Sequence, residues 1–113
     1  MDIRLGQLRI MEINESSGAL PLSMVMPQVS SADLQSLMAW YWSDELSVDP
    51  AAAQFKLIVR SYVLQVGGLN VLVDTCNGND KHRSVPFANQ LHTTYLEDLA
   101  ALGLQPEDIH VVL

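Results

Sequence analysis

The chain has 113 residues, a length that is enough for one modest domain and too short for two. Hydrophobic residues make up 49% of it and charged residues 17%, a composition that suits a folded protein with a core. Thirteen acidic and six basic residues give a formal net charge of −7 without any basic run, which argues against nucleic acid or an anionic membrane as a partner. The single Cys76 excludes an internal disulfide. Since the sequence shows neither a signal peptide nor an apolar run near the ~20 residues of a membrane span, we expect a soluble, cytoplasmic protein.

The N-terminal part predicts short strands followed by loops. Aliphatic residues spaced from Ile3 to Ile13 indicate one or two strands interrupted at Gly6. Residues 14–18 predict a turn, and residues 19–29, which contain two prolines, predict an extended loop packed on the body of the domain.

A short helix is expected from Ser30 or Ser31, either of which can act as its N-cap. Residues 20–42 are rich in Met and include Trp40 and Trp42, which allow two interpretations. They could form an apolar lip over a substrate pocket, or they could simply pack in the core or a lid. We therefore treat residues 14–54 as a lid-like segment of loops with one short helix.

The most informative stretch begins with a strand that opens at Phe55 and runs to Val66. Gly67 and Gly68 then interrupt the apolar pattern, and two residues that tolerate positive φ between strands indicate a β-hairpin. The second strand, Val71–Val73, is apolar at each position, which predicts burial on both faces. It ends at Asp74.

Asp74 is followed by the polar loop TCNGND, residues 75–80. An apolar strand that delivers a carboxylate into a loop of Gly and Asn is one way in which a rigid scaffold presents polar groups at a site. The alternative is that Asp74 only accepts hydrogen bonds from amides of its own loop. Local chemistry alone favours this alternative.

The C-terminal part predicts a helix and a strand. The helix should begin near Thr93 or Thr94 and end at Leu102, with Gly103 just beyond its C-terminus. The segment Ile109–Leu113 has the composition of a buried strand. A strand, a loop, a helix and a second strand form a βαβ unit, so Val71–Val73 and Ile109–Leu113 should be parallel. We predict an α/β fold whose mixed sheet combines the hairpin with this unit.

The chain shows no motif of its own for catalysis. The spacing of Cys76, His82, His92 and His110 matches no familiar zinc site, and His110 is expected to be a packing residue of the last strand. No serine lies in a nucleophile elbow, and there is no glycine-rich phosphate loop.

The stretches SYVLQVGGLNVLVDTCNGNDKHR and FANQLHTTYLEDLAALGLQPEDIHVVL resemble the N-terminal portion of metallo-β-lactamase-fold hydrolases. The similarity is to the branch of N-acyl homoserine lactonases and methyl parathion hydrolase-like enzymes, and it covers residues 55–113. It implies part of an αββα sandwich, so that residues 1–113 would be a single incomplete domain. It also implies two zinc ions held mainly by an HxHxDH motif, which in the family follows the strand corresponding to Ile109–Leu113 and is absent here.

The resemblance implies that Asp74 braces the metal-binding loop without binding metal itself. It places a further group near the mouth of the site, namely Cys76, Asn77, Asn79 and Asp80. No metal ligand or general base of the family corresponds to a residue of this chain.

Two hypotheses follow. The first is the front portion of a zinc-dependent hydrolase of lactone or ester substrates, inactive alone because the metal ligands are missing. The second is a non-catalytic, truncated paralogue that acts as a structural protein and self-associates through its exposed strand edge into a homo-oligomer.

Overall fold

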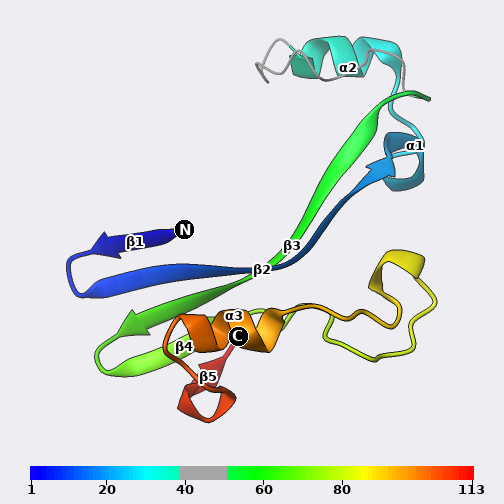
Figure 1. Cartoon of the computed structure of the whole chain (residues 1–113). Helices are drawn as coiled ribbons and strands as arrows, with labels where there is room; N and C mark the ends of the chain where they lie inside the picture. The colour runs from blue at the N-terminus through cyan, green and yellow to red at the C-terminus, as the bar shows by residue number, and fades with distance from the viewer. Residues whose placement is uncertain (39–50) are drawn as a thin grey trace. The chain divides into compact units, whose positions relative to one another are not determined.

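The computed structural model describes residues 1–38 and 51–113 and contains a mixed β-sheet with strand order β1-β2-β3-β4-β5 (Figure 1). The strands are β1 (Asp2–Leu5), β2 (Leu8–Pro21), β3 (Gln54–Val66), β4 (Leu69–Val73) and β5 (Val111–Val112). The helices are α1 (Leu22–Val25), α2 (Ser31–Met38) and α3 (Tyr95–Ala101), with 3-10 turns η1 (Pro86–Ala88) and η2 (Pro106–Asp108). No helix in the described ranges has the length and apolar content needed to cross a bilayer.

The predicted hairpin is confirmed. Strands β3 and β4 pair antiparallel from Val66↔Leu69 to Tyr62↔Val73. Gly67 and Gly68 lie between them with φ of 57° and 80°, a conformation that glycine adopts without the steric cost other residues meet.

Strand β2 is longer than the sequence suggested, and the turn predicted at residues 14–18 is wrong. This segment continues the strand because Met11, Ile13 and Glu15 alternate onto one buried face, at 0%, 1% and 7% exposure. The predicted interruption at Gly6 is correct, since it lies in the tight turn between β1 and β2.

The βαβ unit is confirmed, because β4 and β5 pair parallel with α3 between them in the chain. Gly103 has a φ of 83°, and its N–H donates to the carbonyl of Ala100, as expected at a helix C-terminus. The burial predicted for Val71–Val73 and Ile109–Leu113 was too high. Val71 and Val73 are half-buried because apolar cover lies on the other face of the sheet, and β5 is a two-residue strand whose residues are both exposed.

The chain forms two compact units, and unit 1 comprises residues 1–17 and 58–113. Helix α3 supplies Leu99 to a core that covers one face of the sheet, and Leu104 beyond the helix joins it. The sheet residues of this core are Met11, Ile13, Val63 and Leu72. A second structural layer therefore protects this face.

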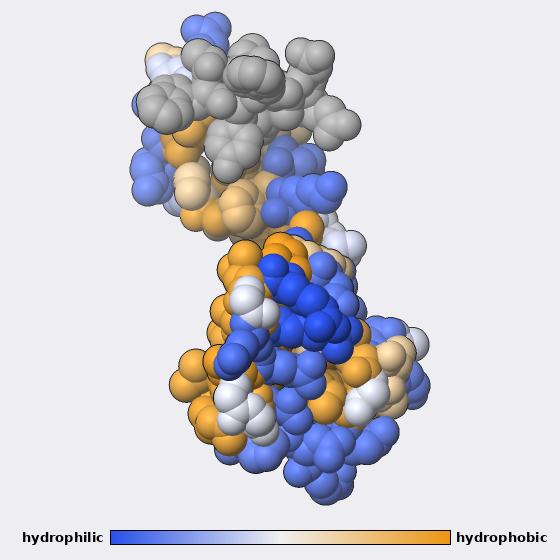
Figure 2. All heavy atoms as spheres, turned by 90° about the vertical axis from the view of Figure 1, so that its left-hand side faces the viewer, coloured by the Kyte–Doolittle hydropathy of each residue, from blue (hydrophilic) through white to orange (hydrophobic). Residues whose placement is uncertain are grey.

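The opposite face of the sheet in unit 1, here called the open face, follows from the alternation and register of the strands. Its apolar members are Ile3, Leu5, Leu8, Ile10, Ile58, Tyr62, Leu64, Val66, Leu69, Val71, Val73, Val111 and, just beyond β5, Leu113. All of them are half-buried or exposed. Figure 2 shows hydrophobic side chains gathered at the molecular surface.

Unit 2 comprises residues 18–57 and has a small core of its own, formed by Leu22, Leu34 and Ala53. The expected helix is present as α2. The Ser30 hydroxyl accepts from the Asp33 N–H, and the Asp33 carboxylate accepts from the Ser30 N–H. The loop predicted at residues 19–29 is partly wrong, since it contains the end of β2 and the short helix α1. Trp40 and Trp42 lie outside the described residues.

Candidate functional site

The ends of two parallel strands define the candidate site. Leu72 pairs with Val112, and the Leu113 N–H donates to the Leu72 carbonyl at 2.9 Å. The Asp74 N–H in turn donates to the Leu113 carbonyl at 3.0 Å. The chain therefore brings Asp74 and Leu113 together at one edge of the sheet, where α/β folds collect their functional residues.

Asp74 turns the chain out of β4. Its φ is 65°, in the left-handed region that Asp tolerates better than most side chains. Its Oδ1 atom accepts a hydrogen bond from the Cys76 N–H at 2.7 Å, which closes an Asx turn. Asp74 thus does bond an amide of its own loop, as the simpler interpretation held. Its side chain is also exposed at the strand end, as the presentation of a carboxylate at a site requires.

The buried hydroxyl of Ser61 stabilises the turn at Asp74. Ser61 is 0% exposed, and its Oγ donates to the Asp74 carbonyl at 2.7 Å. The Tyr95 hydroxyl, from α3, donates to the same Oγ at 2.7 Å. Ser61 Oγ also lies 3.1 Å from Cys76 Sγ, and since its one proton is already donated, the thiol is the donor of that contact.

This arrangement keeps Cys76 protonated. Burial raises the pKa of the Cys76 thiol, and it also raises the pKa of the Tyr95 hydroxyl. A thiolate nucleophile needs the opposite conditions, namely a lowered pKa and a cationic neighbour. Cys76 therefore serves as a neutral packing and hydrogen-bonding group of the loop.

A buried carboxylate that the sequence analysis missed holds the next part of the loop. Glu15, in β2, is 7% exposed, and its Oε2 and Oε1 atoms accept from the N–H groups of Asn77 and Gly78 at 2.9 and 2.7 Å. Glu15 was assigned to a turn. The alternation of Met11, Ile13 and Glu15 was the signal that could have placed it on the buried face.

Asn79 fastens the far end of the loop near the start of α3. Its Nδ2 donates to the Thr93 carbonyl at 2.8 Å, and its Oδ1 accepts from the Thr93 N–H at 2.8 Å. Asp80 Oδ1 lies 3.2 Å from His92 Nδ1, but both side chains are about three-quarters exposed, so this contact adds little stability.

The predicted group near the site mouth therefore has two kinds of member. Cys76 and Asn77 face inward and are half-buried, whereas Asn79 and Asp80 are exposed. The side-chain nitrogen of Asn77 is buried without a hydrogen-bond partner among the described residues. The Arg83 guanidinium donates to the Asn77 carbonyl at 3.0 Å.

The described residues do not fit a metal centre by themselves. Within residues 1–38 and 51–113, no group of three or more His, Cys, Asp or Glu side chains could hold a metal ion. His110, expected to be a packing residue, is exposed, and its Nδ1 accepts from the Asn70 N–H at 3.0 Å. Asp74 Oδ1 is already bonded to its own loop, and the Cys76 thiol keeps its proton.

Sequence comparison found no matching protein-family model and no matching curated protein. Solved structures do match. The dizinc quorum-quenching lactonase AidC, in complex with a product, gives a TM-score of 0.65 at 17% identity over 99% of this chain and 34% of its own. A protein described as a probable metal-dependent hydrolase from Staphylococcus aureus gives 0.67 at 19% identity over 97% and 38%.

The hydrolase AbOPH of the beta-lactamase superfamily gives a TM-score of 0.60 at 15% identity, over 98% of this chain and 33% of its own. The chain thus spans about a third of the length of these structures. At such identities the likeness shows the fold, which is that of part of a metallo-β-lactamase-like αββα sandwich.

Proposed function

We propose that residues 1–113 are the front portion of a metal-dependent hydrolase that acts on lactone or ester substrates. The observation that carries this proposal is the hydrogen bond from the Asp74 N–H to the Leu113 carbonyl, which sets two parallel strand ends side by side at one edge. The similar structures support the assignment, since all three are described as hydrolases or as a lactonase.

In this proposal residues 1–113 position the loop beside the metal centre and do not bind the metal themselves. Ser61 hydrogen-bonds the turn at Asp74, Glu15 hydrogen-bonds the middle of the loop, and Thr93 hydrogen-bonds its far end. Such groups hold catalytic elements in place by fixing the backbone that carries them. In this proposal the metal ligands come from polypeptide outside the described residues, among which no group of three or more His, Cys, Asp or Glu side chains could hold a metal ion.

The buried amide nitrogen of Asn77 supports the same idea. A donor that is shielded from water and has no acceptor is costly, so folded proteins nearly always provide a partner. An acceptor from a segment packed over the loop would satisfy it. Asn77 lies next to the backbone that Glu15 holds, beside the proposed site.

The direct test is the gene sequence beyond the Leu113 codon. We expect it to encode a His-x-His-x-Asp-His pattern shortly after the strand, and the extended protein should retain zinc and hydrolyse N-acyl homoserine lactones or aryl esters. The 113-residue chain is the matched control and should do neither. An unrelated continuation, or an extended protein that binds no metal, would exclude the proposal.

A further inference from the structure

Helix α3 is connected to the Asp74 turn through Tyr95, the first residue of the helix. The Tyr95 ring packs against the buried core of unit 1, and its hydroxyl donates to Ser61 Oγ at 2.7 Å. Burial raises the pKa of this hydroxyl, so it keeps its proton and remains a donor at neutral pH. The proposed function gives no role to this side chain.

Ser61 uses its whole hydrogen-bonding capacity within this group. A hydroxyl has one proton and two lone pairs, and here the lone pairs accept from the Tyr95 hydroxyl and the Cys76 thiol. With both lone pairs occupied, the Ser61 proton is directed to the Asp74 carbonyl. Because Ser61 is fully buried, no water replaces a partner that is removed. The Tyr95 hydroxyl therefore helps to determine where Ser61 donates.

Bonds between Cys76 and Asp74 close the group into a ring. The Cys76 N–H donates to Asp74 Oδ1 at 2.7 Å, and the Cys76 thiol donates to Ser61 Oγ. One carboxylate oxygen of Asp74 is thus fixed by the turn, whereas its Oδ2 has no hydrogen-bond partner among the described residues. Fully satisfied polar networks of this kind are rigid. The ring therefore sets the direction in which Asp74 presents Oδ2 at the strand end.

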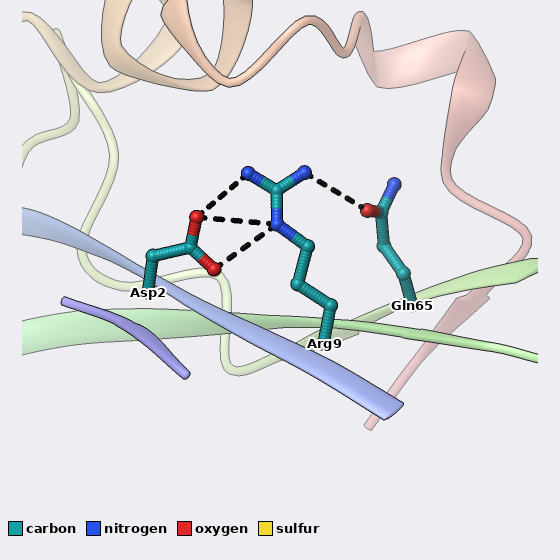
Figure 3. Close-up of polar contacts among 3 residues, drawn as sticks. All are labelled: Asp2, Arg9 and Gln65. Atoms are coloured by element: carbon teal, nitrogen blue, oxygen red, sulfur yellow. Dashed lines mark hydrogen bonds and ion pairs between the residues drawn. The ribbon is translucent and has the colours of Figure 1, made fainter. Parts of the chain in front are cut away.

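A second side-chain network on the sheet has different properties. Asp2, Arg9 and Gln65 are joined by hydrogen bonds across β1, β2 and β3, with Arg9 Nη2 2.8 Å from Asp2 and Arg9 Nη1 3.4 Å from Gln65 (Figure 3). The Arg9 and Asp2 side chains are 30% and 48% exposed, so water can replace the bonds between them. The group around Ser61 differs because its central hydroxyl is shielded from water and because it bonds the residue at the end of β4.

We propose that Tyr95 is a positioning residue of the hydrolase, which acts through Ser61 to orient the Asp74 carboxylate beside the metal centre. The inference rests on the proposed function and adds to it a residue of α3 that touches neither substrate nor metal. Without the Tyr95 hydroxyl, Ser61 keeps an unused acceptor and its proton is no longer held toward the Asp74 carbonyl. The turn then gains freedom, and the carboxylate is presented in the supporting orientation for a smaller fraction of the time.

The test compares Tyr95→Phe with Tyr62→Phe in the extended enzyme, since each variant loses one phenolic hydroxyl and keeps its ring. Tyr62 lies on the open face of β3, and its hydroxyl has no hydrogen-bond partner among the described residues. Tyr95→Phe should lower kcat for the lactone or aryl ester by roughly tenfold, the lower end of the range for groups that orient metal ligands. Its KM should stay near the wild-type value, because Tyr95 does not contact the substrate. Tyr62→Phe should keep the wild-type kcat.

The double variant Tyr95→Phe/Ser61→Ala separates positioning from general loss of structure. Because Tyr95 acts through Ser61, the double variant should have the same kcat as Ser61→Ala, whereas two independent defects would multiply their losses. Thermal melting checks that each variant is folded at the assay temperature.

Three outcomes overturn this inference while leaving the proposed function intact, provided that the wild-type extended enzyme is active. They are a wild-type kcat in Tyr95→Phe, an equal loss in Tyr62→Phe, and multiplied losses in the double variant. A wild-type extended protein that neither retains zinc nor hydrolyses either substrate overturns the proposed function, and this inference with it.

Discussion

Replacing Glu15 by alanine tests whether the candidate site is held as the structure indicates. The carboxylate makes two hydrogen bonds to backbone N–H groups, of 2.9 and 2.7 Å, and bonds to a charged group contribute ~1.5–3 kcal/mol each. Two effects reduce the gross value. Removing a buried carboxylate recovers its desolvation cost, and water can reach the half-buried Asn77 and Gly78 amides. We therefore expect a net loss of about 2 kcal/mol of unfolding free energy.

Urea unfolding measures this loss as a lower midpoint at an unchanged slope. Glu15→Gln retains an acceptor oxygen but loses the charge, so its urea midpoint should lie about midway between those of wild type and Glu15→Ala. Glu107→Gln, at an exposed residue of η2, is the control and should have the wild-type midpoint. Amide hydrogen exchange supplies the local measurement, with faster exchange expected at Asn77 and Gly78 in Glu15→Ala. A variant with the wild-type midpoint and unaltered exchange would refute the role given to Glu15.

The remaining predictions concern the turn at the end of β4. Ser61→Ala removes a fully buried hydroxyl that bonds Asp74, Cys76 and Tyr95, and should lower the free energy of unfolding in urea by about 1–3 kcal/mol; a midpoint equal to that of wild type would contradict this. The pKa of the Cys76 thiol is raised in the folded protein, so as pH rises the unfolded chain, whose thiol has a pKa of ~8.5, loses this proton first. The free energy of unfolding should therefore fall above that pH. In Cys76→Ala the urea midpoint should change less between pH 7.5 and 10 than it does in wild type. Asp74→Ala in the extended enzyme should reduce zinc content or turnover by roughly 10–100-fold, and wild-type values would remove Asp74 from the site.

The parts of the fold that follow from local chemistry were predictable. Gly67 and Gly68 supply positive φ where the hairpin needs it, and Gly103 does the same after α3. The parallel pairing of β4 with β5 follows from the order strand, helix, strand, and the register Leu72↔Val112 agrees with it. In each case a single residue type or a short order of elements determines the geometry.

Burial was less predictable because it depends on what packs on each face. An apolar triplet such as Val71–Val73 is expected to be covered on both sides, yet α3 covers only the side of Leu72. Glu15 was missed for the opposite reason. A carboxylate in a polar stretch suggests a turn, and only its two amide partners 62 and 63 residues away make burial favourable.

The backbone conformation of the loop adds support to its proposed role. Asp74, Cys76 and Asp80 all have φ near 60°, which costs roughly 1–2 kcal/mol per residue outside glycine, somewhat less for Asp. The loop is held by Glu15 and Ser61 on neighbouring strands, and strained backbone fixed by its surroundings is characteristic of positions where geometry serves a function. The strain therefore predicts that the loop keeps this conformation when the strand ends beside it are covered, which is what a support for a catalytic centre must do.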